Sequence, residues 1–323
     1  MNKNKINHLT AVVLSSLILG SCGTISASND STSDSSSIAD SSSSNQSDSQ
    51  STTESNSESV PDSSLSSSDE SSSSNSQSSS SSSIQANSYY DGFDFSLRGE
   101  QLKTALFKKI ASHTNVGYDG LYKVYKTSDV YSDGKIWDMY SSYHFSTGNT
   151  AGSYSKEGDC YNREHTIPQS VFSSKSPMVA DAFHVVPTDG YVNNRRSNYP
   201  HAEVKTVSYT STNNTKVGTS ATSGVSGNVC EPADEYKGDF ARMYFYMVTA
   251  YQDKLSGWKA YASFSKNTYP SLSSWAKTLY LKWSNGDPVS EKEINRNNAI
   301  FAVQHNRNPY IDYPSLCNDV WNS

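Results

Sequence analysis

The chain of 323 residues carries a formal net charge of −6, and at ~100–200 residues per domain its length would allow two domains. Residues 23–87 hold nine acidic and no basic side chains, so residues 88–323 hold 24 basic and 23 acidic side chains, a net charge of +1. This balance excludes the basic footprint of a tight sequence-specific nucleic-acid binder, but not a nucleic-acid substrate whose phosphate contacts are concentrated locally.

The first 22 residues have the pattern of an export signal. Lys3 and Lys5 precede an apolar run over residues 11–19 that is too short for a stable membrane span. The run ends in Leu-Gly-Ser-Cys, which resembles the bacterial lipobox with Cys22 as the lipidated residue. We therefore expect residues 1–22 to be a lipoprotein signal peptide and the protein to be a cell-surface lipoprotein held to the membrane by Cys22. A soluble secreted protein cleaved nearby is the alternative.

Residues 23–87 consist largely of Ser with scattered acidic and amide side chains. Such a composition cannot bury enough apolar surface to offset the entropy lost on ordering. We expect this segment to be a disordered tether. The composition changes abruptly at residue 88, so residues 88–323 are predicted to form the folded domain, which we expect to be a monomer.

The first predicted helix covers residues 97–110, where Leu102, Leu106 and Ile110 recur at steps of four. Residues 118–145 contain Tyr, Val and Trp segments interrupted by Ser-Asp and Ser-Asp-Gly, a pattern that predicts short strands and turns. The segment 207–229 is rich in Ser, Thr, Asn and Gly and is predicted to be a long surface loop.

Three further helices are predicted in the second half of the chain. Residues 239–254 are apolar nearly all round, which predicts a central helix with Asp239 in its first turn. Residues 271–283 predict the next one. The last starts at Ser290, with Glu293 three positions later as a capping box, and runs to about residue 305. The predicted fold class is α+β.

Three cysteines remain in the domain once Cys22 is assigned to lipid, namely Cys160, Cys230 and Cys317. An exported chain permits disulfides, but three thiols cannot all pair within one molecule. A Cys160–Cys230 bond is the pairing that we consider, and the pattern stays open. The spacings fit no zinc motif, so a cysteine-based metal site is not expected.

The chemistry of the chain is concentrated in residues 160–198. Glu164 and His165 are adjacent, and Asn193 follows 28 positions after His165, with arginines nearby. Glu164 and Asn193 offer the oxygen ligands that a hard cation such as Mg²⁺ prefers, and a neutral His165 could take a proton from an attacking water. This inventory suits the cleavage of a phosphodiester with one metal ion.

Two local difficulties accompany this interpretation. Neighbouring side chains of an ideal strand point to opposite faces, so Glu164 and His165 can share a site only where the strand ends, bulges or twists. The adjacent Asn194, instead of Asn193, could supply the amide oxygen that binds the metal ion.

Five ordered sequence blocks resemble the bacterial endonuclease I family of extracellular and periplasmic nucleases. The resemblance covers roughly residues 97–313. The first three blocks are Arg-Glu-His-Thr-Ile-Pro at 163–168, Pro-Thr-Asp-Gly-Tyr-Val-Asn at 187–193 and Arg-Ser-Asn at 196–198. The fourth is Gly-Asp-Phe-Ala-Arg-Met at 238–243, and the fifth is Asp-Pro-Val-Ser at 287–290 with Gln-His-Asn-Arg-Asn-Pro-Tyr at 304–310. Five blocks in one order are highly specific, whereas Glu-His alone would carry almost no information.

The resemblance implies a ββα-metal (His-Me) finger core surrounded by helices. It implies that Glu164 and Asn193 hold Mg²⁺, with Mn²⁺ or Ca²⁺ as alternatives, and that His165 is the general base. His184 takes the second place of a His-His pair whose first place is Phe183 here, and we expect it to be structural or to orient a phosphate, with a direct metal-ligand role as the alternative. The candidate phosphate contacts are three arginines: Arg163, Arg196 and Arg307. Each of them could instead stabilise the site by pairing with a carboxylate such as Asp189 or Asp312.

Within this set Arg196 is the strongest candidate for a catalytic contact, because it lies closest in sequence to Asn193. The preferred interpretation is a metal-dependent endonuclease with little sequence preference that acts on DNA, with RNA left open, and leaves 5′-phosphate and 3′-hydroxyl ends. One alternative is a surface lipoprotein that binds extracellular DNA without cleaving it, although intact Glu164, His165 and Asn193 argue against that. A phosphodiesterase for small nucleotides or lipids is a third possibility.

Overall fold

The computed structural model describes residues 88–150 and 152–322. The predicted signal peptide, Cys22 and the tether lie outside these residues. Helices are α2 (Gly99–Ile110), α3 (Leu121–Ser128), α4 (Gly190–Arg196), α5 (Lys237–Ala250), α6 (Ser274–Gly286), α7 (Glu291–Gln304), α8 (Pro309–Asp312) and α9 (Leu316–Trp321). Short 3-10 turns are η1 (Met178–Ala180), η2 (Asp234–Tyr236) and η3 (Leu255–Gly257). None of the helices in the described ranges is long and apolar enough to cross a membrane.

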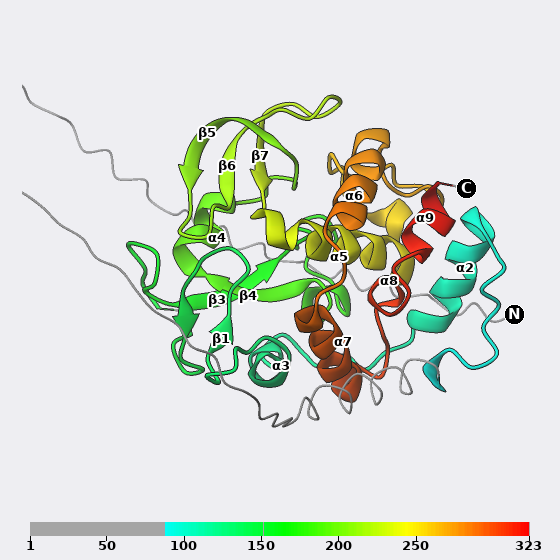
Figure 1. Ribbon diagram of the computed structural model, residues 1–323, viewed down its shortest axis with the longest axis horizontal. Helices are drawn as coiled ribbons and strands as arrows, with labels where there is room; N and C mark the ends of the chain where they lie inside the picture. Colours follow the sequence, from blue (N-terminus) through cyan, green and yellow to red (C-terminus); the bar gives the residue numbers. More distant parts are fainter. Residues whose placement is uncertain (1–87, 151, 323) are drawn as a thin grey trace, which may run out of the picture. The chain divides into compact units, whose positions relative to one another are not determined.

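In the described part of the chain, strands form three small antiparallel sheets (Figure 1), which together with the helices confirm the α+β class. The first pairs β1 (Ile136–Trp137) with β2 (His144–Phe145), and the second pairs β3 (Tyr161–His165) with β4 (Val185–Asp189). The third has the order β5 (Val204–Thr210), β6 (Lys216–Ser220) and β7 (Asn228–Glu231). Of the functional residues predicted from the sequence, Arg163, Glu164 and His165 lie on β3 of the second sheet, and Asn193 and Arg196 lie on α4 beside it.

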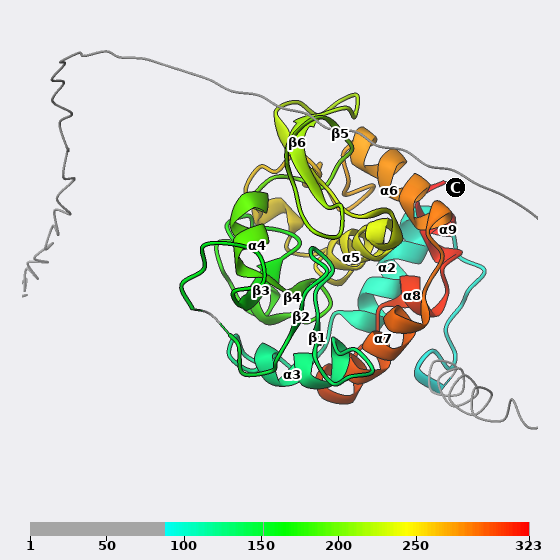
Figure 2. The ribbon, with the colours of Figure 1, turned by 60° about the vertical axis from the view of Figure 1, so that its left-hand side comes forward.

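Helix α5 forms the centre of the core, as predicted from its apolar sequence. Every residue of α5 after Lys237 is buried, and the helix runs between α2, α6 and α8 in both ribbon views (Figures 1 and 2). Phe245 stacks on Trp321 with ring centroids 4.4 Å apart, and Tyr244 stacks on Tyr280 at 4.5 Å. These aromatic contacts hold α5 in the core, where Phe240 and Met243 share a hydrophobic cluster with Val186 of β4.

Two of the five sequence blocks, those at 238–243 and 287–290, meet at the start of α5 and stabilise the fold there. The amide of Gly238 donates to Asp287 Oδ2 at 2.7 Å, and Arg242 binds both oxygens of Glu293 at 2.6 and 2.7 Å. A Cβ on Gly238 would lie 2.3 Å from the carbonyl oxygen of Asp287, so only glycine fits there. Glu293 also completes the predicted capping box with Ser290. The two blocks therefore join α5 to the α6–α7 connection.

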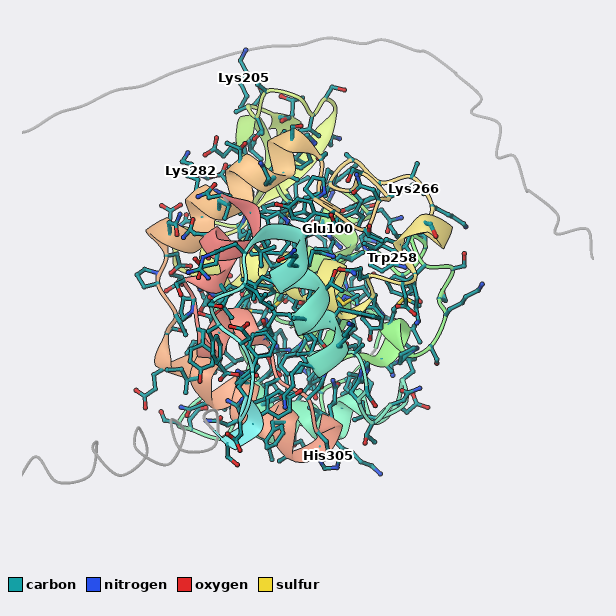
Figure 3. The ribbon with its side chains drawn as sticks, turned by 90° about the vertical axis from the view of Figure 1, so that its right-hand side faces the viewer. Glu100, Lys205, Trp258, Lys266, Lys282 and His305 are labelled. Atoms are coloured by element: carbon teal, nitrogen blue, oxygen red, sulfur yellow. The ribbon has the colours of Figure 1, made fainter. Side chains whose placement is uncertain are left out.

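The other helix predictions agree with the structure to within a few residues. Helix α2 begins two residues after the predicted 97, and α6 lies three residues later than the predicted 271–283. Helix α7 follows Ser290 and ends at His305, which adopts the left-handed conformation (φ 64°). Side chains fill the space between these elements, whereas Lys205 and Lys282 project outward (Figure 3).

Two segment predictions are wrong. Residues 118–145 were expected to hold only strands and turns, but α3 occupies 121–128 and buries Leu121, Val124 and Tyr125 at helical spacing. The segment 207–229 is a sheet rather than a loop. Its strands are polar because β5 is exposed along most of its length, so hydrogen-bonded pairing with β6 decides the structure where side-chain burial does not.

The proposed Cys160–Cys230 bond is not formed. Cys160, Cys230 and Cys317 are all free and buried. Cys160 directs its Sγ to the carbonyl oxygen of Gly152, while Cys230 on β7 packs in a hydrophobic cluster with Val217. Burial raises the pKa of the Cys230 and Cys317 thiols to about 12, so both are unreactive at neutral pH.

Candidate active site

The site is built on β3, β4 and α4, which follow one another as two antiparallel strands and a helix. Tyr161 pairs with Asp189 at one end of the sheet and His165 with Val185 at the other. Asp189 ends β4 and caps α4, because its Oδ1 accepts from the amides of Tyr191 (2.8 Å) and Val192 (3.1 Å). This tight turn lays α4 against β3.

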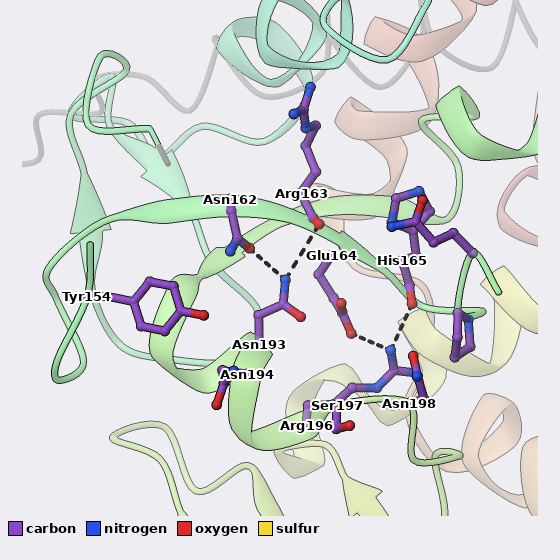
Figure 4. Close-up of a pocket in the computed structure, with 12 residues that line it drawn as sticks. Tyr154, Asn162, Arg163, Glu164, His165, Asn193, Asn194, Arg196, Ser197 and Asn198 are labelled. Carbon is purple, nitrogen blue, oxygen red and sulfur yellow. Dashed lines mark hydrogen bonds and ion pairs between the residues drawn. The ribbon is translucent and has the colours of Figure 1, made fainter. Parts of the chain in front are cut away.

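A cavity of about 300 Å³ opens where α4 faces the end of β3 (Figure 4). Its lining includes six of the residues predicted from the sequence or weighed as alternatives, and the structure brings them together from β3 and α4. The lining residues are Tyr154, Asn162, Arg163, Glu164, His165, Pro168, Gln169, Asn193, Asn194, Arg196, Ser197 and Asn198. His184 and Arg307 do not line it.

Glu164 and His165 share this cavity because β3 ends at His165. Glu164 turns toward α4, where its Oε1 accepts from Nη1 of Arg196 at 2.5 Å. The imidazole of His165 contacts the carbonyl oxygen of Val179 on the other side. The opposite directions of neighbouring strand residues are thus retained, and the cavity reaches both side chains at the strand terminus.

Glu164 is a buried carboxyl group, with 4% of its surface exposed. Burial raises its pKa to about 7, and the positive charge of Arg196 only partly opposes that effect. The protonated and ionised forms of Glu164 are therefore both populated at neutral pH. Only one of its two oxygens is engaged by Arg196.

Asn193 presents its amide oxygen to the same side as Glu164 (Figure 4). Its Nδ2 donates to Asn162 Oδ1 at 2.6 Å and lies 3.5 Å from the carbonyl oxygen of Arg163, and both of these partners are acceptors. The adjacent Asn194 also lines the cavity but is exposed. The geometry therefore favours Asn193 over Asn194 as the residue whose oxygen is presented.

The donor set of this cavity fits a hard divalent cation. Glu164 and Asn193 supply a carboxylate and an amide oxygen on facing elements, the ligand type that Mg²⁺ prefers. Within the described ranges, no group of three or more His, Cys, Asp or Glu side chains could hold an ion. An ion bound here would keep several waters, which leaves room for a phosphate group.

His165 is a neutral imidazole with a defined tautomer. Its Nε2 lies 3.1 Å from the carbonyl oxygen of Val179, which can only accept, so Nε2 carries the proton and Nδ1 is the basic nitrogen. Burial, followed by the nearby His184, lowers the pKa of His165 to about 3. The ring also stacks on Tyr118, with centroids 5.9 Å apart.

His184 has no exposed surface, which corrects the expectation that it contacts the substrate. Its Nε2 donates to the carbonyl oxygen of Met178 at 2.7 Å, and its ring meets that of His165 edge to face at 5.7 Å. Burial lowers its pKa to about 4. Phe183, in the first place of the pair, packs on Tyr246 instead. His184 therefore supports the ring of His165 from the core.

Arg196 connects α4 to the end of β3. Besides Glu164, it donates to the carbonyl oxygens of His165 (2.8 Å) and Thr166 (2.6 Å), and only 1% of its surface is exposed. The charge of Glu164 raises the pKa of Arg196, although burial opposes this. It lines the cavity, but its guanidinium is largely occupied by the protein itself.

Arg163 and Arg307 each pair with a carboxylate. The Arg163 side chain points away from Glu164 (Figure 4), lies 3.5 Å from the ring centre of Tyr118 and pairs with Asp119 at 2.9 Å. Arg307 is buried and binds both oxygens of Asp312 at 2.8 and 2.7 Å. Arg307 is thus held away from the cavity, which corrects the substrate-binding expectation for it, whereas Arg163 lines the cavity and stays a predicted phosphate contact.

Three residues of the site were not predicted from the sequence. Asn162 orients Asn193, and strand alternation from Glu164 could have indicated it, since positions i and i+2 share a face. Tyr118 stacks on His165 and Tyr154 lines the cavity. Both tyrosines come from segments that connect the helices and strands, and no sequence pattern marks either of them.

Comparisons with known proteins agree with the chemistry of the cavity. A family model described as Endonuclease I matches residues 98–315, which is more than half of the chain. The chain is 29% identical over 245 residues to the "Extracellular ribonuclease" of Bacillus subtilis (strain 168), covering 73% of this chain and 78% of that protein. It is 30% identical over 241 residues to the "Extracellular ribonuclease" of Bacillus amyloliquefaciens, covering 69% and 74%.

A third relative is named as an endonuclease. The chain is 31% identical over 132 residues to the "Endonuclease-1" of Buchnera aphidicola subsp. Baizongia pistaciae (strain Bp), covering 41% of this chain and 45% of that protein. The matches therefore include relatives named for ribonuclease activity and one named as an endonuclease.

Proposed function

The chain belongs to the endonuclease I family and is an endonuclease, and from this premise we propose that it hydrolyses DNA, and RNA as well, with little sequence preference. The observation that carries the proposal is the cavity shared by Glu164, His165 and Asn193. The family consists of divalent-metal nucleases, and Mg²⁺ is the ion that we propose, with Mn²⁺ or Ca²⁺ as alternatives. The names of the two Bacillus relatives support the inclusion of RNA.

His165 acts as the general base in this proposal. Its Nδ1 accepts a proton from water, while Nε2 keeps its hydrogen bond to the carbonyl oxygen of Val179. The water oxygen forms a bond to phosphorus as the bond between phosphorus and the 3′ oxygen breaks. The leaving 3′ oxygen takes a proton from solvent water and His165 returns its proton to solvent, so the products carry a 5′-phosphate and a 3′-hydroxyl. A divalent ion held by Glu164 and Asn193 would supply Lewis-acid stabilisation of the charge that develops on the phosphate oxygens.

Arg196 is a positioning residue in this scheme. Its bonds to Glu164 and to the carbonyl oxygens of His165 and Thr166 keep the metal-binding carboxylate and the base at a fixed separation. The order of β3, β4 and α4, with Glu164 and His165 on one strand and Asn193 on the helix, supports a ββα-metal (His-Me) finger.

We further propose that the protein acts outside the cell. The two Bacillus relatives are named as extracellular ribonucleases, which supports secretion. The lipobox-like sequence at Cys22 supports a lipid anchor, followed by a tether over residues 23–87 and the catalytic domain over 88–323.

Cleavage of supercoiled plasmid and of a labelled RNA, each with Mg²⁺ and with chelator, tests the proposal. Chelator-sensitive cleavage of both polymers is expected, with a small chromogenic phosphodiester hydrolysed far more slowly. Retention of uncut plasmid by the wild-type protein in Mg²⁺ would favour the DNA-binding alternative, and fast hydrolysis of the small diester would favour a small-molecule phosphodiesterase.

A further inference from the structure

Tyr154 occupies one end of the catalytic cavity and has no role in the chemistry described so far. It comes from the segment between β2 and β3, and it lines the cavity together with Asn162, Asn193 and Asn194. Its hydroxyl points toward the two α4 asparagines in Figure 4. Among the described residues, no hydrogen bond engages that hydroxyl, and the side chain is partly exposed.

The position of the Tyr154 ring is enforced by Gly190. A Cβ on Gly190 would lie 2.7 Å from Cδ1 and 3.1 Å from Cε1 of Tyr154, so the ring rests on the bare backbone at the start of α4. The lack of a side chain at the first residue of α4 is what lets a tyrosine from a distant segment reach the cavity.

The segment that carries Tyr154 is braced beside it. Asp159 Oδ2 accepts from the amides of Ser155 (2.7 Å) and Lys156 (3.1 Å), and these bonds lower the pKa of Asp159. The amide of Gly158 donates to Asp189, the same carboxylate that caps α4. The backbone on the carboxyl side of Tyr154 is therefore tied to the helix that bears Asn193.

Tyr154 and His165 lie on either side of Glu164 and Asn193 (Figure 4). If His165 activates the attacking water, as in the proposed function on which this inference rests, the leaving 3′ oxygen must lie on the opposite side of phosphorus, because attack and departure are in line. The Tyr154 end of the cavity is the end that would receive the nucleotide carrying that oxygen.

We propose that Tyr154 and Gly190 form a subsite for the nucleotide that retains the 3′ oxygen. The Tyr154 hydroxyl donates a hydrogen bond to an oxygen of that nucleotide's sugar-phosphate backbone. In RNA the 2′-hydroxyl is adjacent to the leaving 3′ oxygen, so the same subsite senses the difference between RNA and DNA.

Substitution of Tyr154 by Phe and by Ala tests the subsite by two readouts. Binding of single-stranded RNA and DNA of one sequence is measured by fluorescence anisotropy in chelator, where no cleavage occurs, and cleavage is measured separately in Mg²⁺. Tyr154→Phe should weaken binding by about 3–10-fold, the usual worth of one hydrogen bond, with thermal stability and Mg²⁺ affinity unchanged. A larger loss on RNA assigns the contact to the 2′-hydroxyl, whereas an equal loss on both assigns it to an oxygen that both share and overturns the discrimination between RNA and DNA.

The structure offers a matched control and a second-site test. Tyr143 rests on Gly158 as Tyr154 rests on Gly190, but it does not line the cavity. Tyr143→Phe should bind and cleave as wild type does. Gly190→Ala should displace the Tyr154 ring and match Tyr154→Ala in binding, and the double variant should be no worse than either single variant.

The inference is overturned if Tyr154→Phe binds and cleaves both polymers as wild type does, or if Tyr143→Phe shows the same loss. It is also overturned if the Gly190→Ala and Tyr154→Ala losses are additive. Failure of the proposed function would differ from either result, because the wild-type protein would then bind the strands in chelator but cleave neither in Mg²⁺.

Discussion

Nη1 of Arg196 lies 2.5 Å from Oε1 of Glu164, and both side chains are buried at the junction of β3 and α4. The contact joins the carboxylate expected to hold a metal to the helix that carries Asn193. Because Arg196 also donates to two backbone carbonyls, the ion pair is part of the scaffold that defines the cavity.

Removal of Arg196 should therefore destabilise the fold as well as the site. Arg196→Ala leaves a buried carboxylate and two carbonyl oxygens without their donor, and the expected loss is about 3–5 kcal/mol of unfolding free energy at pH 8, where Glu164 is ionised. Denaturant unfolding measures it. Arg195→Ala is the control, because this neighbouring guanidinium is exposed and should leave stability unchanged. Equal stability of the two variants would show that the buried pair is not structural.

Metal binding should release a proton below pH 7. Burial raises the pKa of Glu164 to about 7, whereas a cation requires the carboxylate form. Mg²⁺ binding should therefore release about 0.9 proton at pH 6 and about 0.1 at pH 8, and affinity should rise with pH through 7. His165 contributes no proton, since its pKa is about 3. Calorimetry in buffers of different ionisation enthalpy measures the release, and identical enthalpies at pH 6 would contradict the assignment.

The three central residues should separate into two classes. His165→Ala should lower plasmid cleavage by about 10²–10⁴-fold, the usual worth of a general base, with Mg²⁺ affinity nearly intact. Glu164→Ala should weaken metal binding and cleavage together, with partial recovery in excess Mg²⁺. Calorimetric titration of each variant distinguishes them. Loss of metal binding in His165→Ala would make His165 a ligand and would require a different scheme.

The two adjacent asparagines of α4 should behave differently. Asn193→Ala removes the oxygen directed toward the Glu164 side and should weaken Mg²⁺ binding, whereas Asn194→Ala serves as the control and should not. Asn162→Ala should act like a milder Asn193→Ala, because it frees the amide that Asn162 Oδ1 holds at 2.6 Å. Metal titration of the three variants checks this. A loss confined to Asn194→Ala would move the ligand by one residue.

Substitution of Cys22 tests the anchor. Cys22→Ser removes the thiol that a lipid would modify, so the protein should move from the detergent-soluble membrane fraction to the medium or periplasm. Fractionation followed by immunoblotting measures the distribution. Unchanged membrane retention would exclude lipid on Cys22 as the anchor, and unchanged cleavage by the released protein would show that anchoring and catalysis are independent.

Features encoded over short stretches could be predicted from the sequence. The Ser290–Glu293 capping box and the apolar pattern of α5 are local, since a few consecutive residues determine each of them. The proximity of Glu164 and His165 to Asn193 was also predictable, because one short supersecondary unit holds all three. Local hydrogen bonding and helical periodicity act within such stretches, so the sequence by itself determined these elements and the chemical inventory of the site.

Only the tertiary structure decided which partner each long side chain meets. Arg163 pairs with Asp119, and Arg307 pairs with Asp312. His184 is buried in the core. The sequence around each of these three residues equally allowed a contact with substrate. The β5–β6–β7 sheet and the seat of Tyr154 on Gly190 likewise depend on contacts between segments that are distant in the chain. Residue type limits what a charged or aromatic side chain can bind, but packing between distant segments determines what lies within its reach.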